Sequence, residues 1–185
     1  MNIRRGGKWF QRWRVPLGFL IAPIFVLLAR PRLLTLAVGG AIGLAGLFLR
    51  AWAAGYLRKN DQLATAGPYA YTRNPLYLGS FLIGLGFTVT AGRWILALLF
   101  AVLFLGIYVP VMRVESATLQ GIFGDDYRRY ASSVPMLVPR LTAYRDAAHV
   151  EFDSALYKRY REYQAALGFA IAWVVLALKA VYFHY

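Results

Sequence analysis

One stretch interrupts an otherwise apolar chain with proline, glycine, tyrosine and charge: Gly67-Pro68-Tyr69-Ala70-Tyr71-Thr72-Arg73-Asn74-Pro75-Leu76-Tyr77-Leu78-Gly79-Ser80. Its Gly-Pro and Asn-Pro steps disfavour the helical conformation in the residue before each proline. The stretch therefore predicts a shaped loop that runs directly into a helix opened by Pro75 at its first position. Backbone N–H groups at the start of such a helix are available to a ligand.

The overall composition is that of a membrane protein. Of the 185 residues, 59% are hydrophobic and only 16% are charged, and the mean hydropathy is +0.49. Soluble domains carry about 25% charged residues. The net charge of +13 is better explained by anionic lipid, which attracts each Lys or Arg near the membrane surface by about 1 kcal/mol, than by nucleic acid. We therefore expect a lipid environment and no nucleic-acid partner.

The residue types that build thiol and metal chemistry are scarce. The chain has no cysteine, which excludes disulfides, thiolate metal sites and a cysteine nucleophile. Its two histidines, His149 and His184, are too far apart in the sequence to indicate a metal cluster. We therefore expect no metal.

Five apolar runs predict an all-α integral membrane protein with about five transmembrane helices. The runs cover residues 15–29, 33–57, 75–90, 94–112 and 163–178. The segment before the last run is too polar to span a membrane, and we expect it to lie along the cytoplasmic face as amphipathic helices. Its final part, residues 141–164, fits either a basic amphipathic helix that gates lipid access or a plain connector.

These runs divide the chain into three regions. Residues 1–57 hold a basic aromatic collar and the first helical hairpin, residues 58–139 hold the core with its motifs, and residues 140–185 hold the amphipathic connector and the last span. With Arg50 left out, sixteen Lys and Arg lie on the side of the collar and the polar segments, against four on the other. The positive-inside rule then predicts a cytoplasmic N-terminus and cytoplasmic motifs, with the C-terminus opposite. We expect a bacterial inner membrane.

The second apolar run carries four glycines and one charge. The glycines are Gly39, Gly40, Gly43 and Gly46. Because they lie inside an apolar helix, they predict close packing against another helix and not a nucleotide-binding loop. Arg50 interrupts the run near its cytoplasmic end, and two interpretations stand: a side chain that reaches the interface, or a contact with an anion or a lipid headgroup.

A second constellation follows the fourth apolar run. It contains Arg113-Val114-Glu115-Ser116, Leu119, Phe123-Gly124, Tyr127, Tyr130, Val134-Pro135 and Pro139. Since the runs at 75–90 and 94–112 form one antiparallel hairpin, Arg113 and Glu115 should lie near Asn74. A carboxylate and an arginine there could hold a polar, charged cofactor; ordinary interfacial charges are the alternative. Tyr127 and Tyr130 fit either interfacial anchors or walls of an adenine or sulfonium pocket.

Together the two motifs resemble those of the isoprenylcysteine carboxyl methyltransferase and phospholipid methyltransferase superfamily of integral membrane enzymes. The resemblance covers roughly residues 46–139. Asn74 stands where the carboxyl methyltransferases usually carry His and looks more like the phospholipid branch, whereas Ser116 replaces the second Glu of the family's pair. Asn74 thus favours a phospholipid amine as acceptor, while the Val-Pro ending and the Phe-Gly-x-x-Tyr pattern favour an isoprenylcysteine-like carboxylate. A thiol or hydroxyl acceptor also fits.

The resemblance implies a membrane methyltransferase that binds S-adenosylmethionine outside any Rossmann fold, and no Gly-x-Gly-x-x-Gly follows a predicted strand. By this resemblance the cofactor would be held by Asn74, Pro75, Tyr77, Leu78, Gly79, Glu115, Tyr127 and Tyr130. The phosphate or carboxylate of a lipid or small amphiphilic acceptor would contact Arg50, Arg73 and Arg113, and the catalytic set would be Glu115, Arg113 and Arg73.

Two other functions are compatible with the same motifs. Sterol reductases are distant relatives with similar loops, which makes an NADPH-dependent membrane reductase the first alternative. A non-catalytic helical membrane protein whose polar segment docks partners is the second, favoured by Ser116 in place of the second Glu.

Overall fold

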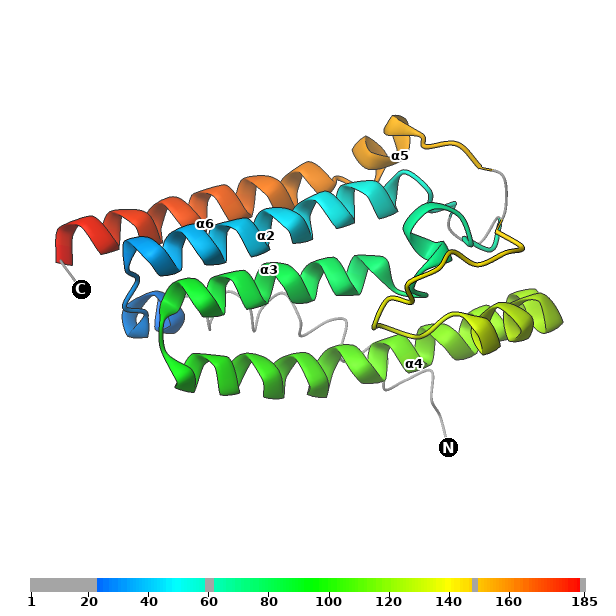
Figure 1. Cartoon of the computed structure of the whole chain (residues 1–185), viewed down its shortest axis with the longest axis horizontal. Coiled ribbons are helices and arrows are strands. Elements are labelled where there is room, and N and C mark those ends of the chain that lie inside the picture. Colours follow the sequence, from blue (N-terminus) through cyan, green and yellow to red (C-terminus); the bar gives the residue numbers. More distant parts are fainter. Residues whose placement is uncertain (1–22, 59–61, 148–149, 184–185) are drawn as a thin grey trace.

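The computed structural model describes residues 23–58, 62–147 and 150–183, and every regular element within them is helical (Figure 1). The elements are α2 (Leu33–Ala54), the 3-10 helix η1 (Gly67–Ala70), α3 (Pro75–Ala91), α4 (Trp94–Ser133), α5 (Ser154–Arg159) and α6 (Glu162–Phe183). Residues 23–28 are also helical. The predicted all-α fold is confirmed.

Three described helices are long and apolar enough to cross a membrane: α2, α4 and α6. α3 is equally apolar but has 17 residues. Most of the span predicted at residues 15–29 lies outside the described residues, as do the basic aromatic residues before it. The structure therefore supports a membrane-spanning bundle without establishing the expected number of five spans.

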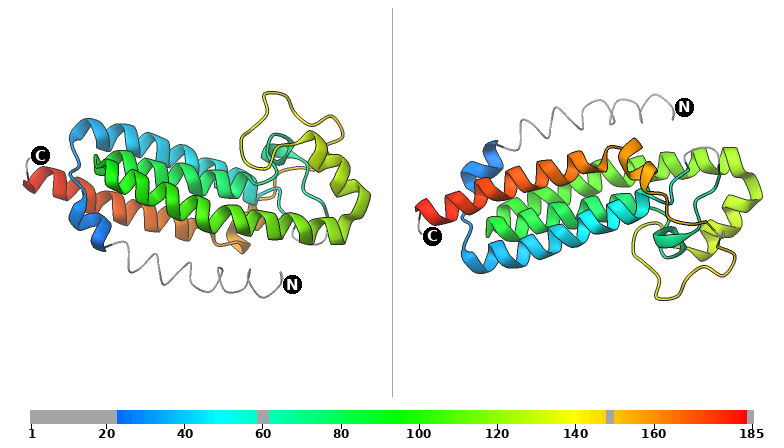
Figure 2. Two further views of the ribbon diagram at one scale, coloured as in Figure 1. Left: turned by 90° about the horizontal axis from the view of Figure 1, so that it is seen from below. Right: turned by 90° about the horizontal axis from the view of Figure 1, so that it is seen from above.

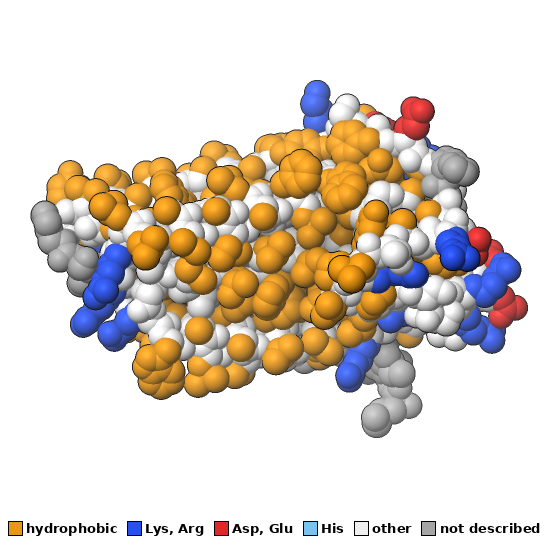
Figure 3. Space-filling model, in the orientation of Figure 1, with side chains coloured by type: hydrophobic (Ala, Val, Ile, Leu, Met, Phe, Trp, Pro, Cys, Tyr) orange, Lys and Arg blue, Asp and Glu red, His pale blue; other side chains and the backbone are white. Residues whose placement is uncertain are grey.

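The long helices run along one axis of the molecule, and the two long connecting segments, between α2 and α3 and between α4 and α6, gather at one end (Figures 1 and 2). Chain direction alternates, so the end of α2, the start of α3, the second half of α4 and the start of α6 meet at that end. On the face shown in Figure 3, hydrophobic side chains cover the middle of the bundle and charged ones lie toward its two ends. This is the distribution expected of a protein whose sides contact lipid.

Glycines allow α2 and α3 to pack closely, as the sequence predicts. A Cβ atom added at Gly46 would lie 2.6 Å from the carbonyl oxygen of Gly79, and one added at Gly79 would lie 2.8 Å from the carbonyl oxygen of Gly46. Only glycine permits such an approach of two helix backbones. The prediction that these glycines serve helix packing is confirmed, and the contact between Gly46 and Gly79 fixes the position of α3 against α2.

The segment after residue 112 differs from its predicted form. α4 continues to Ser133, with a break at Gly124, whose φ of 53° and ψ of −120° are non-helical. Residues 134–153 contain no helix among those described, so over its first half the segment 141–164 is a connector, one of the two forms expected for it, and not an amphipathic helix. Prolines at 135 and 139 oppose a helix, and downstream backbone N–H groups bond to the loop before α3 instead.

Candidate functional site

The two sequence motifs are joined by hydrogen bonds. The backbone N–H of Arg73 donates to the Pro135 carbonyl at 2.9 Å, and that of Arg140 donates to the Tyr71 carbonyl at 2.9 Å. The Asn74 side-chain amide donates to the Met136 carbonyl at 2.8 Å. The loop of residues 67–74 therefore has its shape fixed by the segment of residues 134–144, sixty positions later in the chain.

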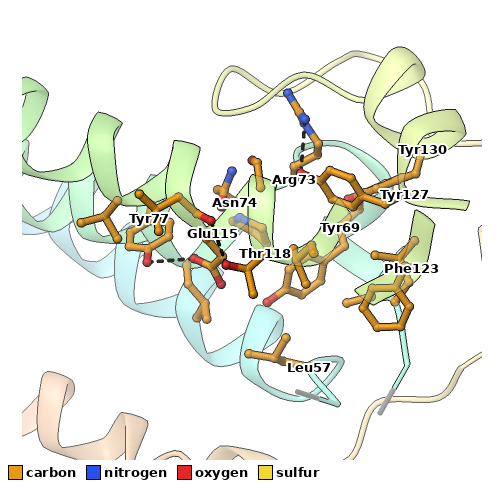
Figure 4. A pocket seen from close by; sticks show the side chains of 18 of the residues that line it. Leu57, Tyr69, Arg73, Asn74, Tyr77, Glu115, Thr118, Phe123, Tyr127 and Tyr130 are labelled. Carbon is orange, nitrogen blue, oxygen red and sulfur yellow. Dashed lines mark hydrogen bonds between the residues drawn. The ribbon is translucent and has the colours of Figure 1, made fainter. Parts of the chain in front are cut away.

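Pro75 opens α3 at its first position, as predicted, with Asn74 in the preceding non-helical conformation. The hairpin formed by α3 and α4 brings the two motifs to the same level, where the Tyr77 hydroxyl donates to Oε2 of Glu115 at 3.0 Å. The predicted proximity of Glu115 to the start of α3 is thus observed. Figure 4 shows Tyr77, Asn74 and Glu115 grouped at this point.

A cavity of about 540 Å³ opens at this end of the bundle. It is lined by Arg50, Leu57, Arg58, Gln62, Leu63, Ala64, Tyr69, Arg73, Asn74, Pro75, Leu76, Tyr77, Ser80, Tyr108, Val111, Val114, Glu115, Ser116, Thr118, Leu119, Phe123, Tyr127 and Tyr130. Its volume lies within the range of small-molecule sites, about 300 to 1,000 Å³. The lining combines one carboxylate, three arginines and six aromatic rings, which suits a polar ligand carrying both signs of charge.

The break at Gly124 directs two tyrosines at the cavity. Tyr127 and Tyr130 are three residues apart and therefore share one face of the helical segment after the break. The Tyr130 hydroxyl donates to the Tyr69 carbonyl at 2.7 Å. Burial raises the pKa of Tyr130, and burial together with the negative charge of Glu115 raises that of Tyr69. Both phenols stay neutral at physiological pH.

Arg50 is held by a carboxylate that the sequence did not indicate. Its guanidinium makes a two-pronged ion pair with Glu162 at the start of α6, with N···O distances of 2.8 to 2.9 Å. Nη1 of Arg50 also donates to Ser80 Oγ at 2.6 Å and to the Leu76 carbonyl at 3.2 Å. The preceding Arg161 has a φ of 55°, the only positive value at a non-glycine residue among those described. This turn starts α6 with Glu162 facing α2.

An apolar groove adjoins the polar cavity. It has a volume of about 460 Å³ and lies between α3, α4 and α6, with Phe100, Phe104 and Phe169 among its lining residues. Arg50, Ser80 and Tyr108 line both the groove and the cavity. The two spaces therefore meet at these three side chains, next to the ion pair that Arg50 makes with Glu162.

The structure brings together most of the residues selected from the sequence. Asn74, Pro75, Tyr77, Glu115, Tyr127, Tyr130, Arg50 and Arg73 all line the polar cavity. Leu78, Gly79 and Arg113 do not line it: Gly79 packs against α2, and Arg113 is exposed on α4. Arg113 and Glu115 are two residues apart on one helix, so their side chains point about 200° apart. That spacing separates Arg113 from the site that contains Glu115.

Sequence reasoning missed Glu162, Tyr69 and Tyr108. One signal for Glu162 was present: a charged residue inside an apolar helix needs a partner of opposite charge, and Glu162 is an acid directly before the last apolar run, in the first turn of α6. Tyr108 stacks on Phe104 at 4.8 Å between ring centroids. Nothing in its apolar surroundings distinguishes it from a core residue.

Residues 25–126, more than half of the chain, match the phospholipid methyltransferase family. The chain belongs to this family. The superfamily resemblance inferred from the two motifs is thereby confirmed. No solved structure shows a significant match to the chain.

Curated relatives of the chain carry different names. The cobalt-zinc-cadmium resistance protein CzcN of Cupriavidus metallidurans is 38% identical over 149 residues, which cover 72% of this chain and 64% of that protein. The protein-S-isoprenylcysteine O-methyltransferase of Schizosaccharomyces pombe is 33% identical over 143 residues, covering 72% and 60%. The methanethiol S-methyltransferase of Crocosphaera subtropica is 35% identical over 71 residues, covering 38% and 27%. The chain therefore spans less than two thirds of each relative.

One of these names refers to metal resistance. Across the described ranges, no three His, Asp or Glu side chains lie close enough together to hold a metal ion.

Proposed function

We propose that the protein transfers a methyl group from S-adenosylmethionine to an amphiphilic acceptor dissolved in the membrane. The single observation that carries this proposal is the meeting of a polar, charged cavity and an apolar groove at Arg50, Ser80 and Tyr108. The methyl donor is polar and the acceptor is part apolar, so each requires its own kind of space, and the reaction requires that the two spaces meet.

The residues of the polar cavity suit this cofactor. S-adenosylmethionine has an amino acid end with both charges, a sulfonium cation and an adenine ring. The lining supplies Glu115 for an amino or hydroxyl group, arginines for a carboxylate, and the faces of Tyr127, Phe123 and Tyr69 for a cation or an aromatic ring. When bound, the cofactor supplies the electrophilic methyl carbon.

The protein's contribution is then alignment and exclusion of water, since methyl transfer is an in-line displacement that needs no covalent help from the enzyme. Glu115 is oriented by the Tyr77 hydroxyl. Asn74 acts as a positioning residue, because its amide holds the 134–137 segment against the start of α3. Arg50, itself oriented by Glu162, lies where the acceptor's polar end would meet the donor.

The acceptor would enter from the bilayer along the groove between α4 and α6. A phospholipid amine and an isoprenylcysteine-like carboxylate are the two candidate acceptors, and both combine an apolar chain with a polar end. Of the three arginines that line the cavity, Arg50 and Arg73 would contact its phosphate or carboxylate. The excess of basic residues at the motif end supports a cytoplasmic cavity, in keeping with the proposed bacterial inner membrane.

Calorimetric titration of the detergent-purified protein with S-adenosylmethionine and with NADPH tests the cofactor. We expect binding of the methyl donor only, and Glu115→Gln should weaken it about 10- to 150-fold because a charge-assisted hydrogen bond contributes about 1.5 to 3 kcal/mol. Glu151→Gln, at an exposed carboxylate outside the cavity, is the matched control. Binding of NADPH alone would indicate the reductase alternative, and binding of neither would indicate a docking protein.

The acceptor class can be distinguished by the stability of the product. Incubation with lipid extract and methyl-labelled donor gives either an ester or an N-methyl product. A methyl ester releases its label as methanol in alkali, whereas an N-methyl group retains it. Label that remains non-volatile after alkali favours the amine, and label released as volatile methanol favours the carboxylate.

A further inference from the structure

A second polar groove lies on the outer side of the α4 segment that walls the cavity. Its volume is about 500 Å³, and Arg73, Ser116 and Tyr127 line both this groove and the cavity. The polar lining consists of Arg73, Arg113, Arg128, Ser116, Gln120 and Ser132. Among the residues that line it there are three arginines and no carboxylate. This outer groove is therefore a basic concavity with neutral hydrogen-bonding groups between the arginines.

The arginines of the outer groove are largely uncommitted to the protein. Nε of Arg73 is buried without a hydrogen-bond partner in the described part of the chain, and its Nη1 makes only a long contact of 3.4 Å to the Tyr127 hydroxyl. In Figure 4 the Arg73 side chain points away from Glu115. Arg128 pairs with Asp125 at 3.1 Å, but both side chains are well exposed, so this pair neutralises the groove only weakly.

The position of Arg113 sets the depth of the outer groove relative to a bilayer. Arg113 follows the apolar run of α4 that starts at Trp94, an exposed aromatic residue suited to the opposite interface. At about 1.5 Å per residue, α4 rises about 28 Å between Trp94 and Arg113, which matches a hydrocarbon core of about 30 Å. Arg113 therefore lies at the level of the lipid phosphates when Trp94 lies at the other interface.

We propose that the outer groove binds the headgroup of an anionic phospholipid of the adjacent leaflet. Arginine forks are matched to phosphate oxygens, and Ser116, Gln120 and Ser132 can bond the polar remainder of the headgroup. This lipid is distinct from the methyl acceptor, because Arg113 and Arg128, which would hold its headgroup, line the outer groove and not the cavity. The proposal does not depend on methyl transfer and accounts for Arg113, which the cavity does not use.

Titration of the detergent-purified protein with short-chain phosphatidylglycerol, short-chain phosphatidylcholine and glycerol phosphate tests the proposal, with bound molecules counted by native mass spectrometry. We expect phosphatidylglycerol to bind more tightly than the other two. Arg113→Gln and Arg128→Gln should each weaken it about five-fold, the effect of one basic residue near the membrane surface. Both residues are exposed, so both variants should fold.

Arg93→Gln, at the other end of the α4 span, is the matched control and should retain the affinity for phosphatidylglycerol. Equal losses in Arg93→Gln and Arg113→Gln would overturn the proposal, because they would indicate general attraction to positive charge. Equal binding of glycerol phosphate and phosphatidylglycerol would overturn the lipid assignment in favour of a soluble phosphate. Equal binding of phosphatidylglycerol and phosphatidylcholine would overturn the assignment to an anionic lipid, because the net charge of the headgroup would then not be recognised.

Discussion

The break in α4 at Gly124 should separate two glycine substitutions that are otherwise alike. Gly121 and Gly124 lie three residues apart, and a Cβ added at either meets nothing within 4 Å. Of these two glycines, only Gly124 has a positive φ, of 53°. Gly121→Ala should therefore stabilise the protein by about 0.5 to 1 kcal/mol, whereas Gly124→Ala should destabilise it by about 1 to 3 kcal/mol through backbone strain.

The two midpoints of thermal unfolding in detergent should then differ by roughly 3 to 16 °C, since about 1 kcal/mol shifts a protein of this size by 2 to 4 °C. Gly124→Ala should also weaken S-adenosylmethionine binding, because the break is what directs Tyr127 and Tyr130 at the cavity. Gly121→Ala should bind normally. Equal unfolding midpoints for the two variants would refute the conclusion that the break depends on the glycine at position 124. Equal affinities for S-adenosylmethionine would refute the conclusion that the break directs Tyr127 and Tyr130 at the cavity.

Three further outcomes follow from buried polar contacts. Glu162→Gln should lower the free energy of unfolding by about 3 kcal/mol, because it leaves Arg50 without its carboxylate partner. A double-mutant cycle with Arg50→Gln should show strong coupling between the two residues, and additive losses would contradict the ion pair. Tyr130→Phe should cost about 1 to 3 kcal/mol by leaving the buried Tyr69 carbonyl unpaired, against under about 0.5 kcal/mol for the control Tyr144→Phe. Because burial raises the pKa of Tyr130, its contribution to the free energy of unfolding should be constant below the ordinary tyrosine pKa of about 10 and should be lost as the pH rises toward the raised value. When unfolding is measured at increasing alkaline pH, Tyr130→Phe should lose less stability than the unchanged protein.

Local rules predicted the parts of the site that depend on neighbouring residues. Pro75 at the first helical position follows from the geometry of proline. The position of Glu115 near the start of α3 follows from a hairpin of two apolar runs, and its contact with Tyr77 is observed there. The close helix packing at Gly46 follows from small residues inside apolar helices, whereas its partner Gly79 was expected at the cofactor.

The sequence could not predict contacts between distant segments. Arg50 and Glu162 are 112 positions apart, and only the packing of α6 against α2 brings them together. The segment after Pro139 has an amphipathic pattern, but its backbone N–H groups are used by the loop before α3, as when Tyr144 N donates to the Ala70 carbonyl at 3.0 Å. A pattern of side chains does not reveal that the backbone N–H groups of the segment form hydrogen bonds with a distant loop and not within a helix.

Helix geometry separates Glu115, predicted to hold the cofactor, from Arg113, predicted to contact the acceptor. The two residues are two positions apart, and residues two apart on a helix face different directions. Their separation leaves Glu115 in the cavity and Arg113 in the outer groove.

Methyl transfer measured directly tests the central proposal. The purified protein would be incubated with methyl-labelled S-adenosylmethionine and membrane lipid extract, and label would be counted in the organic phase for the unchanged protein, Glu115→Gln and Glu151→Gln. We expect label to accumulate with the unchanged protein and with Glu151→Gln and to be largely lost with Glu115→Gln. If no labelled lipid formed even with the unchanged protein, or if Glu115→Gln labelled lipid as well as the unchanged protein does, the assignment of the polar cavity as the methyl-donor site would be contradicted.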